Sequence, residues 1–206
     1  MYSNLVSFVK LSPNCTKPRG KKIDTITIHH AAGNASVETL GNIFAPTSRK
    51  ASANYGIGSD GRIACFVEEE NRAWTSSSTA NDDRAITIEV ANCGAEPDWP
   101  ISDKAYAALL DLCEDICRRH GIVLNYTGDK TGNLTMHKWF KATACPGPYL
   151  ESKFPAIADQ VNRRLNKQTL YRVQVGAFHV KDNAIRMREN LKNAGFEGAF
   201  IVEVNP

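Results

Sequence analysis

The sequence predicts an α/β fold in which helices flank a central mixed β-sheet, followed by a small C-terminal βαβ unit. Two patterns support this prediction. Short runs rich in β-branched residues alternate in polarity at 25–29 and 85–91, and such alternation is typical of strands with one buried face. Stretches with helical start and stop signals lie between and after them, and a loose alternation of strands and helices is typical of α/β proteins.

The first half of the chain is expected to be rich in strands. Residues 1–22 are interrupted by prolines and glycine, so we expect an irregular arm that packs on the domain. Ser36 is a favourable N-cap for a short helix that ends at Phe44, before Pro46. The expected elements are this arm (1–22), a strand (25–29), a helix (36–44), a hairpin with its turn at 59–62 (54–67) and a strand (85–91).

The second half predicts longer helices and a change of composition near residue 166. Ser102 can cap a helix that runs to His120, with Gly121 as its stop signal. A further helix is placed from Pro155 to Leu165, because proline is well tolerated in a first helical turn. These residues complete a predicted main domain, 1–166.

A polar linker then leads into a tail, 167–206. The tail is predicted as a strand (171–178), a helix capped by Asp182 and ended by Gly195, and a strand (200–204). Chains below roughly 40 residues rarely bury a sufficient core alone. We therefore expect this tail to dock on a partner surface or to pair with a second copy.

The composition favours a globular protein. Of 206 residues, 42% are hydrophobic and 23% are charged, which argues against disorder and against a membrane protein. The formal charge of +3 would suit an anionic polymer such as cell wall or nucleic acid, but solvated lysines explain it equally well, and no arginine cluster supports nucleic acid. The first ten residues do not resemble a secretory signal. The six scattered cysteines are expected to be free thiols in a reducing cytoplasm.

His29, His137 and Cys145 are candidate ligands of one catalytic zinc ion. Two imidazoles and a thiolate match the softness of zinc and its tetrahedral preference better than they match magnesium or calcium. Three protein ligands leave the fourth position for water, which is typical of a hydrolase rather than of a structural finger. His137 and Cys145 are too far apart for one helical turn, so a loop would have to curl around the ion.

Strand alternation adds a carboxylate to this site. His29 shares a strand face with Thr25 and Thr27, and Glu89 shares a face with Thr87. If both strands lie in one sheet with a common core, His29 and Glu89 open onto the same polar groove. We expect Glu89 to act as general base and acid rather than as a ligand.

Packing roles remain open for each of these residues when it is taken alone. His30 is the rival of His29, but it has the parity of the apolar face, which favours a role in the core or in support of the ligands. His120 at a helix end is expected to compensate the helix dipole. Cys113 and Cys117 are expected to be buried apolar cysteines, and the acidic run 68–70 is expected to be a solvated turn.

These motifs resemble those of zinc-dependent N-acetylmuramoyl-L-alanine amidases, the family shared by phage endolysins, bacterial wall amidases and peptidoglycan recognition proteins. The resemblance covers the chain from roughly 23 to 165. The matching stretches are TITIHH (25–30), ANYGIGSDG (53–61), AITIEV (85–90), TMH (135–137) and TACPG (143–147).

The resemblance implies that His29, His137 and Cys145 hold Zn²⁺ and that Glu89 is catalytic. It also implies a peptidoglycan-recognition-protein-like amidase fold. Thr143 stands where relatives have a lysine or threonine directed at the developing oxyanion; a hydroxyl is a weaker electrostatic partner there than an ammonium. Thr75 stands where many relatives have a histidine, so no role is transferred to it. Substrate contacts are expected from residues in or near these motifs: Asn54, Tyr55, Trp74 and Lys141.

The implied function is hydrolysis of the amide between N-acetylmuramic acid and L-alanine in peptidoglycan. The expected setting is a phage or prophage endolysin that accumulates in the host cytoplasm and then acts at the cell wall. A bacterial autolysin and a non-hydrolytic peptidoglycan recognition protein are the alternatives; the complete set of ligands disfavours the latter.

The tail resembles one half of a sporulation-related repeat, a module associated with glycan binding, through YRVQVGAF (171–178). That module normally has two βαβ halves. Wall binding or pairing into a homodimer are both open for it, and neither nucleic acid nor stable membrane insertion is expected.

Overall fold

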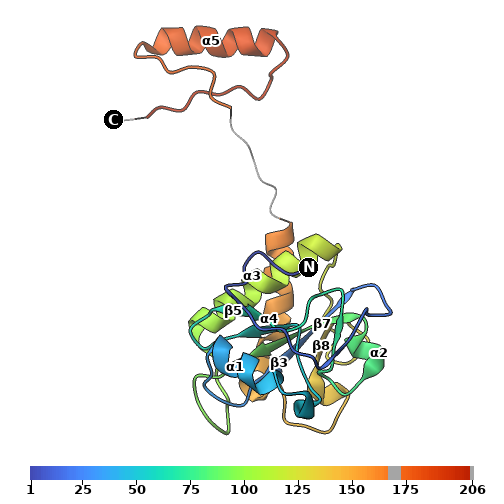
Figure 1. The fold of residues 1–206 in the computed structure, drawn as a ribbon. Helices are drawn as coiled ribbons and strands as arrows, with labels where there is room; N and C mark the ends of the chain where they lie inside the picture. Colours follow the sequence, from blue (N-terminus) through green and yellow to red (C-terminus); the bar gives the residue numbers. More distant parts are fainter. Residues whose placement is uncertain (167–172, 205–206) are drawn as a thin grey trace. The chain divides into compact units, whose positions relative to one another are not determined.

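The computed structural model describes residues 1–166 and 173–204. Its contacts divide the chain into two compact units, Met1–Lys167 and Gln168–Pro206, which are described separately (Figure 1). Over the described ranges, every helix is too short or too polar to cross a membrane.

A mixed six-stranded sheet forms the centre of the first unit. Strands β4, β7, β3 and β8 run parallel to their neighbours, whereas β5 is antiparallel to β4, and β1 is parallel to β5. In spatial order the strands are β1 (Phe8–Val9), β5 (Ile63–Cys65), β4 (Tyr55–Ile57), β7 (Ala85–Val90), β3 (Thr25–His30) and β8 (Leu134–Met136). The prediction of a mixed sheet flanked by helices is confirmed.

The register of the central strands places polar and apolar side chains on opposite faces. Ile28 pairs with Ile88, and His29 pairs with Glu89. Residues paired in a parallel ladder project to the same side, because side chains alternate along each strand. The predicted alternation is therefore confirmed for both strands.

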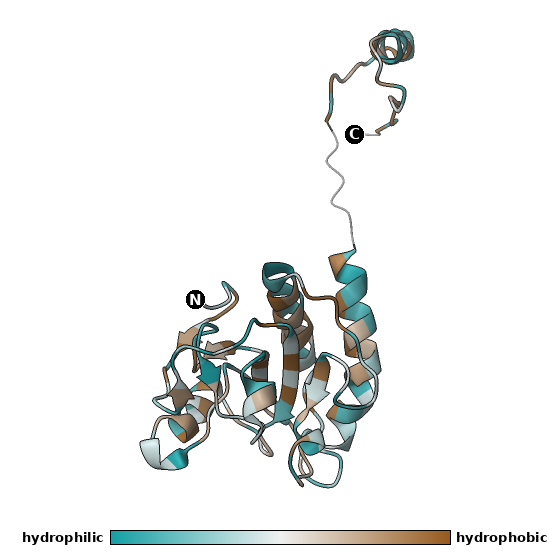
Figure 2. Cartoon of the chain, turned by 90° about the vertical axis from the view of Figure 1, so that its right-hand side faces the viewer, coloured by the Kyte–Doolittle hydropathy of each residue, from teal (hydrophilic) through white to brown (hydrophobic). Residues whose placement is uncertain are grey.

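Two long helices cover the apolar face of this sheet: α3 (Asp103–His120) and α4 (Pro148–Leu165). The main core joins Ile28 and Ile88 to Leu109, Ile116 and Phe154, all of them fully buried. Figure 2 shows the hydrophobic residues concentrated in the central strands and on helix faces that adjoin them.

The opposite face is partly apolar and partly polar. Helix α1 (Val37–Phe44) packs over β4 and β5 through a smaller cluster that includes Leu40 and Phe66. Gly56 permits this close approach, because a Cβ there would lie 2.3 Å from Cε2 of Phe66.

Elsewhere on this face the buried side chains are hydroxyls and amides. Thr27 Oγ1 lies 2.8 Å from Thr135 Oγ1, and Asn81 Nδ2 of α2 (Thr79–Asp82) donates to Thr27 Oγ1 at 2.9 Å. The polar face of the sheet therefore begins with a buried hydrogen-bonded network of hydroxyls and amides. His29 and Glu89 lie near the ends of the strands on the same face.

The N-terminal arm packs on the domain as predicted, but it also contains short strands. Besides β1, β2 (Cys15–Thr16) pairs with β6 (Arg72–Ala73) in a second, two-stranded sheet. Arg19 fastens the arm, because its guanidinium donates to five backbone carbonyl groups. These belong to Glu69, Asn71, Asp82, Asp83 and Ala85.

Two helix predictions are confirmed and one start is wrong. Ser36 Oγ accepts from the N–H of Thr39, and Ser102 Oγ accepts from that of Ala105, so both predicted caps are present. Helix α4 begins at Pro148, not at Pro155, which lies inside the helix. Only Pro148 occupies the first helical turn, where proline is well tolerated, and Gly147 before it permits the sharp change of chain direction with φ of 80°.

The second unit contains helix α5 (Lys181–Asn193), as predicted. Asp182 lies in its first turn rather than at the cap, which is Val180. Tyr171 and Arg172 of the predicted first strand lie outside the described residues. Within 173–204 neither predicted strand forms, so the βαβ prediction is wrong for its described strand residues. A strand requires a hydrogen-bonded neighbour, and the described part of this unit does not supply one.

Candidate metal centre

His29 and Glu89 lie beside one another near the C-terminal ends of β3 and β7. They are direct partners in the parallel ladder. His29 is only 1% exposed, and Glu89 is partly exposed. Parallel strands commonly present functional groups at their carboxyl ends, and here the ladder register fixes a histidine next to a carboxylate.

His137 comes to the same place because β8 pairs with the other side of β3. Met136 pairs with Ile28, so the residues that follow them, His137 and His29, are also neighbours. Their ring centroids are 4.8 Å apart. At His137 the chain turns into a short 3₁₀ segment, η2 (His137–Trp139).

Cys145 is returned to the site by the loop that follows η2. The N–H of Lys138 donates to the carbonyl of Cys145 at 3.2 Å, which closes the loop. Cys145 Sγ lies 3.6 Å from His29 Nδ1. Potential ligand atoms of His29, His137 and Cys145 all lie within 4.8 Å of one another. The structure thus brings together the three residues that the sequence singled out.

Burial favours the neutral form of both imidazoles. It lowers the pKa of His29 far below its usual value, and the positive forms of His137 and His30 would lower it further. Burial also lowers the pKa of His137, against an opposing effect of Asp82. Neutral imidazole is the form that binds a metal ion.

The thiol and the carboxyl are shifted in the opposite direction. Burial, reinforced by Glu89, raises the pKa of Cys145. Burial raises the pKa of Glu89 to about 8, with Arg49 opposing the shift. A cation among these groups would compensate their negative charge, since an opposite charge nearby favours ionised forms.

The residues present fit a zinc ion. Within the described chain, the buried atoms His29 Nε2, His137 Nε2 and Glu89 Oε2 have no hydrogen-bond partner. Buried polar atoms are normally paired, so unpaired atoms in one cluster call for an explanation such as an ion or water. Two nitrogens and one sulfur are a donor set that zinc binds in catalytic sites.

His30 lies behind the site rather than in it, as its parity predicted. It is 8% exposed, and its ring packs edge-on against Trp99 with centroids 5.4 Å apart. A Cβ at Gly147 would lie 3.2 Å from two atoms of the His30 ring, so His30 contacts the turn that follows Cys145.

Thr143 and Lys141 are exposed on the loop between His137 and Cys145. Thr143 Oγ1 accepts a hydrogen bond from the N–H of Cys145 at 3.2 Å. This bond ties the hydroxyl to the backbone of the candidate ligand and leaves its proton free to donate.

The prediction that Asn54 and Tyr55 contact substrate is wrong. Both are fully buried. The Asn54 side chain bonds the Thr87 backbone and the carbonyls of the 67–71 loop. Tyr55 belongs to the main core and therefore lies on the face of the sheet opposite to the site. Their position in a matching motif gave no information on which face they occupy.

Trp74, which like Lys141 is a predicted substrate contact, lines a pocket of about 350 Å³. The pocket is linked to the strand that carries Glu89, because Thr75 in its lining bonds Thr87 through their hydroxyls at 2.8 Å, and Thr87 lies two residues before Glu89 on the same face. The lining combines two basic residues, one acidic residue and several hydroxyls: Lys50, Arg72, Asp82, Thr75, Ser77, Ser78 and Thr79.

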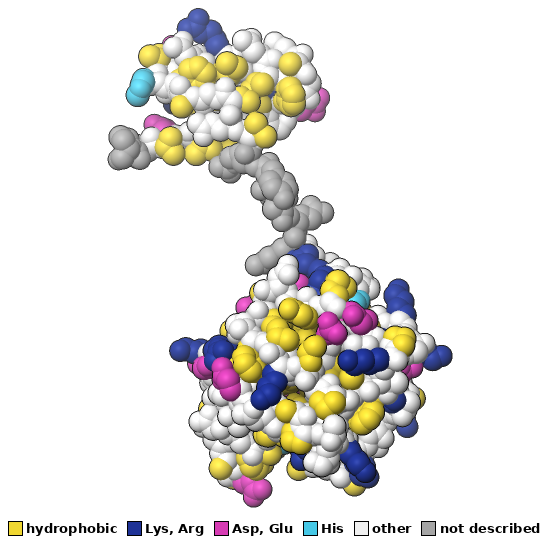
Figure 3. Space-filling view, in the orientation of Figure 1, with side chains coloured by type: hydrophobic (Ala, Val, Ile, Leu, Met, Phe, Trp, Pro, Cys, Tyr) yellow, Lys and Arg dark blue, Asp and Glu magenta, His cyan; other side chains and the backbone are white. Residues whose placement is uncertain are grey.

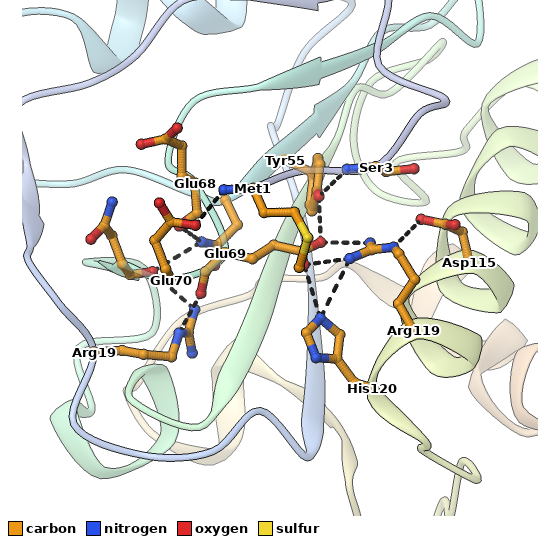
Figure 4. Close-up of polar contacts among 12 residues, drawn as sticks. Met1, Ser3, Arg19, Tyr55, Glu68, Glu69, Glu70, Asp115, Arg119 and His120 are labelled. Carbon is orange, nitrogen blue, oxygen red and sulfur yellow. Dashed lines mark hydrogen bonds and ion pairs between the residues drawn. The ribbon is translucent and has the colours of Figure 1, made fainter.

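A buried ionic cluster surrounds Glu69, and the sequence did not predict it (Figure 4). Glu69 is 1% exposed and accepts hydrogen bonds from Tyr55, Arg119 and His120. The prediction of a solvated turn is therefore wrong at this residue. His120 does lie at the end of α3, but its partner is this carboxylate. Cys113 and Cys117 are buried apolar cysteines, as predicted.

Comparison with known proteins agrees with this geometry. The family profile for N-acetylmuramoyl-L-alanine amidase matches residues 19–148, which is more than half of the chain. The SPOR domain profile matches residues 152–203, so it begins within α4. A search of curated proteins finds no match.

Several solved structures share the fold at low sequence identity. A mutant endolysin from Bacillus subtilis is 20% identical with a TM-score of 0.59, covering 76% of this chain and 99% of that one. N-acetylmuramoyl-L-alanine amidase LysC from Clostridium intestinale is 18% identical with a TM-score of 0.54, covering 79% and 99%. Drosophila peptidoglycan recognition protein SA is 19% identical with a TM-score of 0.55, covering 71% and 90%.

At these identities the structural likeness shows the fold, whereas the profile match over more than half of the chain shows the family. This chain belongs to the N-acetylmuramoyl-L-alanine amidase family and is an enzyme of that class.

Proposed function

We propose that this protein is a zinc-dependent peptidoglycan amidase that cleaves the bond between the lactyl group of N-acetylmuramic acid and L-alanine. The observation that carries the proposal is the meeting of His29, His137 and Cys145 within 4.8 Å, beside Glu89. Two observations support zinc as the ion: the buried ring nitrogens of both histidines that have no hydrogen-bond partner, and the donor set of two nitrogens and one sulfur.

In this proposal His29, His137 and Cys145 hold the ion. Zinc, when bound, supplies Lewis-acid polarisation of the scissile carbonyl and lowers the pKa of water. The protein contributes a preformed cluster, because His29 is fixed by β3 and His137 by the neighbouring β8. The hydrogen bond between Lys138 and Cys145 fixes the third ligand.

Glu89 would transfer the proton. Its carboxylate takes a proton from the attacking water as oxygen bonds to the carbonyl carbon. It then gives that proton to the nitrogen of L-alanine as the C–N bond breaks. Its buried environment, which raises the pKa of its carboxyl, suits a group that must both hold and release a proton near neutral pH.

Thr143 would assist at the developing oxyanion. Its Oγ1 is occupied as an acceptor by the Cys145 N–H, so the hydroxyl proton is available to a substrate oxygen. A neutral donor stabilises negative charge less than an ammonium group does, so we expect a smaller role for Thr143 than for Glu89.

The surroundings of the site suit an anionic, sugar-containing polymer. Trp74 offers a flat apolar surface, and Lys50 and Arg72 in the same pocket offer positive charge. Lys141 is exposed on the ligand-bearing loop. We propose that this pocket binds peptidoglycan and that the SPOR-like tail also acts at the cell wall.

An endolysin role is the finer part of the proposal. It is supported by the fold shared with an endolysin from Bacillus subtilis. In that role the protein would be held in the host cytoplasm before it acts at the wall.

Digestion of purified peptidoglycan tests the activity through the chemical ends that it creates. We expect free N-terminal alanine and no new reducing sugar. Glu89→Gln should lower the rate by about 10²- to 10⁴-fold, the range typical of a general acid–base residue, while its zinc content stays unchanged. Glu38→Gln, at a partly exposed glutamate in the first turn of α1 that pairs with Arg62, is the matched control. New reducing sugar without alanine, or a wild-type rate in Glu89→Gln, would overturn the proposal.

A further inference from the structure

A strained tryptophan stands out in the first unit, whose visible surface is an ordinary mixture of charges. Figure 3 shows basic and acidic side chains interspersed over that face. Trp99, by contrast, has φ of 51°, which lies in the left-handed region that bulky residues rarely adopt. Such backbone strain persists only where surrounding contacts impose it, and it is concentrated at functional sites. The contacts of Trp99 therefore indicate its role.

Asn92 fastens Trp99 to the ends of the two central strands. The Asn92 side chain is fully buried, and its Nδ2 donates to the carbonyl of Trp99 at 2.6 Å. Its backbone N–H donates to the carbonyl of Gly33 at 2.9 Å. Asn92 lies two residues after the end of β7, and Gly33 lies three residues after the end of β3. The tryptophan is thus anchored beside the strands that carry His29 and Glu89.

The side chain of Trp99 lies between two segments that each follow a proposed metal ligand. Its ring packs edge-on against His30, the residue after His29, with centroids 5.4 Å apart. Its Cβ is 3.1 Å from the position that a Cβ would take at Gly147, two residues after Cys145. One side chain therefore contacts the chain next to the first ligand and the chain next to the third.

The same loop also fixes the start of α4, directly after the cysteine turn. The N–H groups of a first helical turn have no partner within the helix. The capping residue, Gly147, has no side chain to accept such a bond, but the N–H of Tyr149 donates to the carbonyl of Asp98 at 3.2 Å. Asp98 precedes Trp99, so the cysteine turn is held at its far side by the same segment.

Other bonds of Cys145 do not set its distance from β3. Its carbonyl accepts from the N–H of Lys138, and its N–H donates to Thr143 Oγ1. Both bonds lie within the loop itself. Contact with β3 comes through His30: burial raises the pKa of Cys145, and a hydrogen bond from the His30 backbone opposes that rise. Trp99 packs against this same His30 and closes the contact from outside.

We propose, on the basis of the zinc site proposed above, that Trp99 is a positioning residue: held by Asn92, it keeps Cys145 at the distance from His29 that a shared ion requires. In the structure Cys145 Sγ lies 3.6 Å from His29 Nδ1. Without the indole ring the cysteine turn would move away from β3, whereas His29 and His137 would stay, because adjoining strands fix them. Loss of the ring should therefore act on the sulfur ligand. Residues that support a metal ligand in this way typically change metal affinity by about 10- to 100-fold.

Competition with a chelator measures the effect on zinc affinity. Trp99→Gly should lower the affinity by about 10- to 100-fold, although glycine relieves the strain at this backbone angle and keeps the carbonyl that Asn92 binds. Trp99→Phe retains a ring against His30 and should recover most of the affinity. Tyr106→Ala, which removes a partly buried aromatic ring packed on the main core, is the matched control and should bind zinc as the wild type does. Equal affinity in the wild type and Trp99→Gly would overturn the proposal.

Cobalt in place of zinc shows which ligand is weakened. A thiolate bound to Co²⁺ gives a sulfur-to-metal charge-transfer absorption, whereas the visible bands report the coordination geometry of the ion as a whole. We expect the charge-transfer band to weaken in Trp99→Gly when the ion is saturating, because Cys145 is the displaced ligand. An unchanged charge-transfer band in that variant would contradict a role in positioning the cysteine.

Hydrogen exchange on the metal-free protein separates this proposal from the proposed function. The N–H of Gly147 donates to the carbonyl of Ala144 at 2.8 Å, and that of Tyr149 is bonded to the tryptophan loop. Both amides should exchange at least about tenfold faster in Trp99→Gly but not in Tyr106→Ala, because local opening follows the loss of local contacts. Unchanged exchange would overturn the proposal. A wild-type protein that binds no zinc would refute the proposed function, and the exchange rates would still decide whether Trp99 holds the cysteine turn.

Discussion

Neighbouring residues of this chain take opposite roles because their backbone directions differ. His29 and His30 are adjacent on β3, yet one faces His137 and Cys145 while the other packs against Trp99. The sequence was sufficient to separate them, because side chains alternate along a strand. It was also sufficient to bring Glu89 to His29, since both strands show the same alternation.

The environment of the acidic run 68–70 could not be predicted from the residues themselves. Three consecutive glutamates are typical of a solvated turn, and Glu70 is indeed exposed. Glu69 differs only because Arg119 and His120 reach it from the end of α3, about 50 positions away along the chain. No local pattern contains that contact, so the sequence could not predict it.

Glu69→Gln is expected to destabilise the protein in a pH-dependent way. Burial alone would raise the pKa of Glu69, but hydrogen bonds from His120, Arg119 and Tyr55 outweigh it and lower the pKa to about 2. The shift from the usual 4.5 corresponds to about 3 kcal/mol. A carboxyl with a lowered pKa stabilises the fold fully above its usual pKa and loses that contribution as the pH falls towards the folded value.

Chemical denaturation at several pH values measures this contribution. The wild-type advantage over Glu69→Gln should be about 3 kcal/mol at pH 6 and should shrink between pH 4.5 and 2. Glu70→Gln is the adjacent control, and it should cost no more than about 1 kcal/mol, as expected for an exposed ion pair. An advantage that does not change across this pH window would contradict the buried ionic cluster.

Helices and strands were predictable where the residues within them carry a clear local signal. The caps of α1 and α3 and the alternation of β3 and β7 are local signals, and all of them are confirmed. Strand β8 has only three residues and was missed, because such a short run has no measurable period. The strands predicted within 173–204 had the right composition, but composition cannot supply a hydrogen-bonded neighbour.

The close packing of α1 on the sheet makes Gly56 intolerant of a side chain. Gly56→Ala would place Cβ at 2.3 Å from Phe66 and should lower the free energy of unfolding by about 1–3 kcal/mol, the usual cost of overpacking a core. Gly33→Ala is the matched control, because a Cβ there meets nothing within 4 Å. Thermal unfolding of both variants measures the difference; equal stability would contradict the packing of α1 against β4.

At the scale of the whole molecule, the chain joins a catalytic unit with its own core to a second unit that has no fully buried residue between 173 and 204. The first unit was predictable because its motifs lie at the ends of strands that the sequence identifies. Closure of the site was not, because the loop from His137 to Cys145 has no regular period. The hydrogen bond from Lys138 to Cys145 closes it.

The central claim is that His29, His137 and Cys145 together hold one catalytic zinc ion. The most direct test is the zinc content of the dialysed protein, measured by elemental analysis. We expect about one zinc per chain in the wild type. His137→Ala and Cys145→Ala should lose it, whereas His179→Ala and Cys93→Ala, at exposed residues that are not members of the cluster, should retain it. Zinc retained in both ligand variants, or absent from the wild type, would contradict the account.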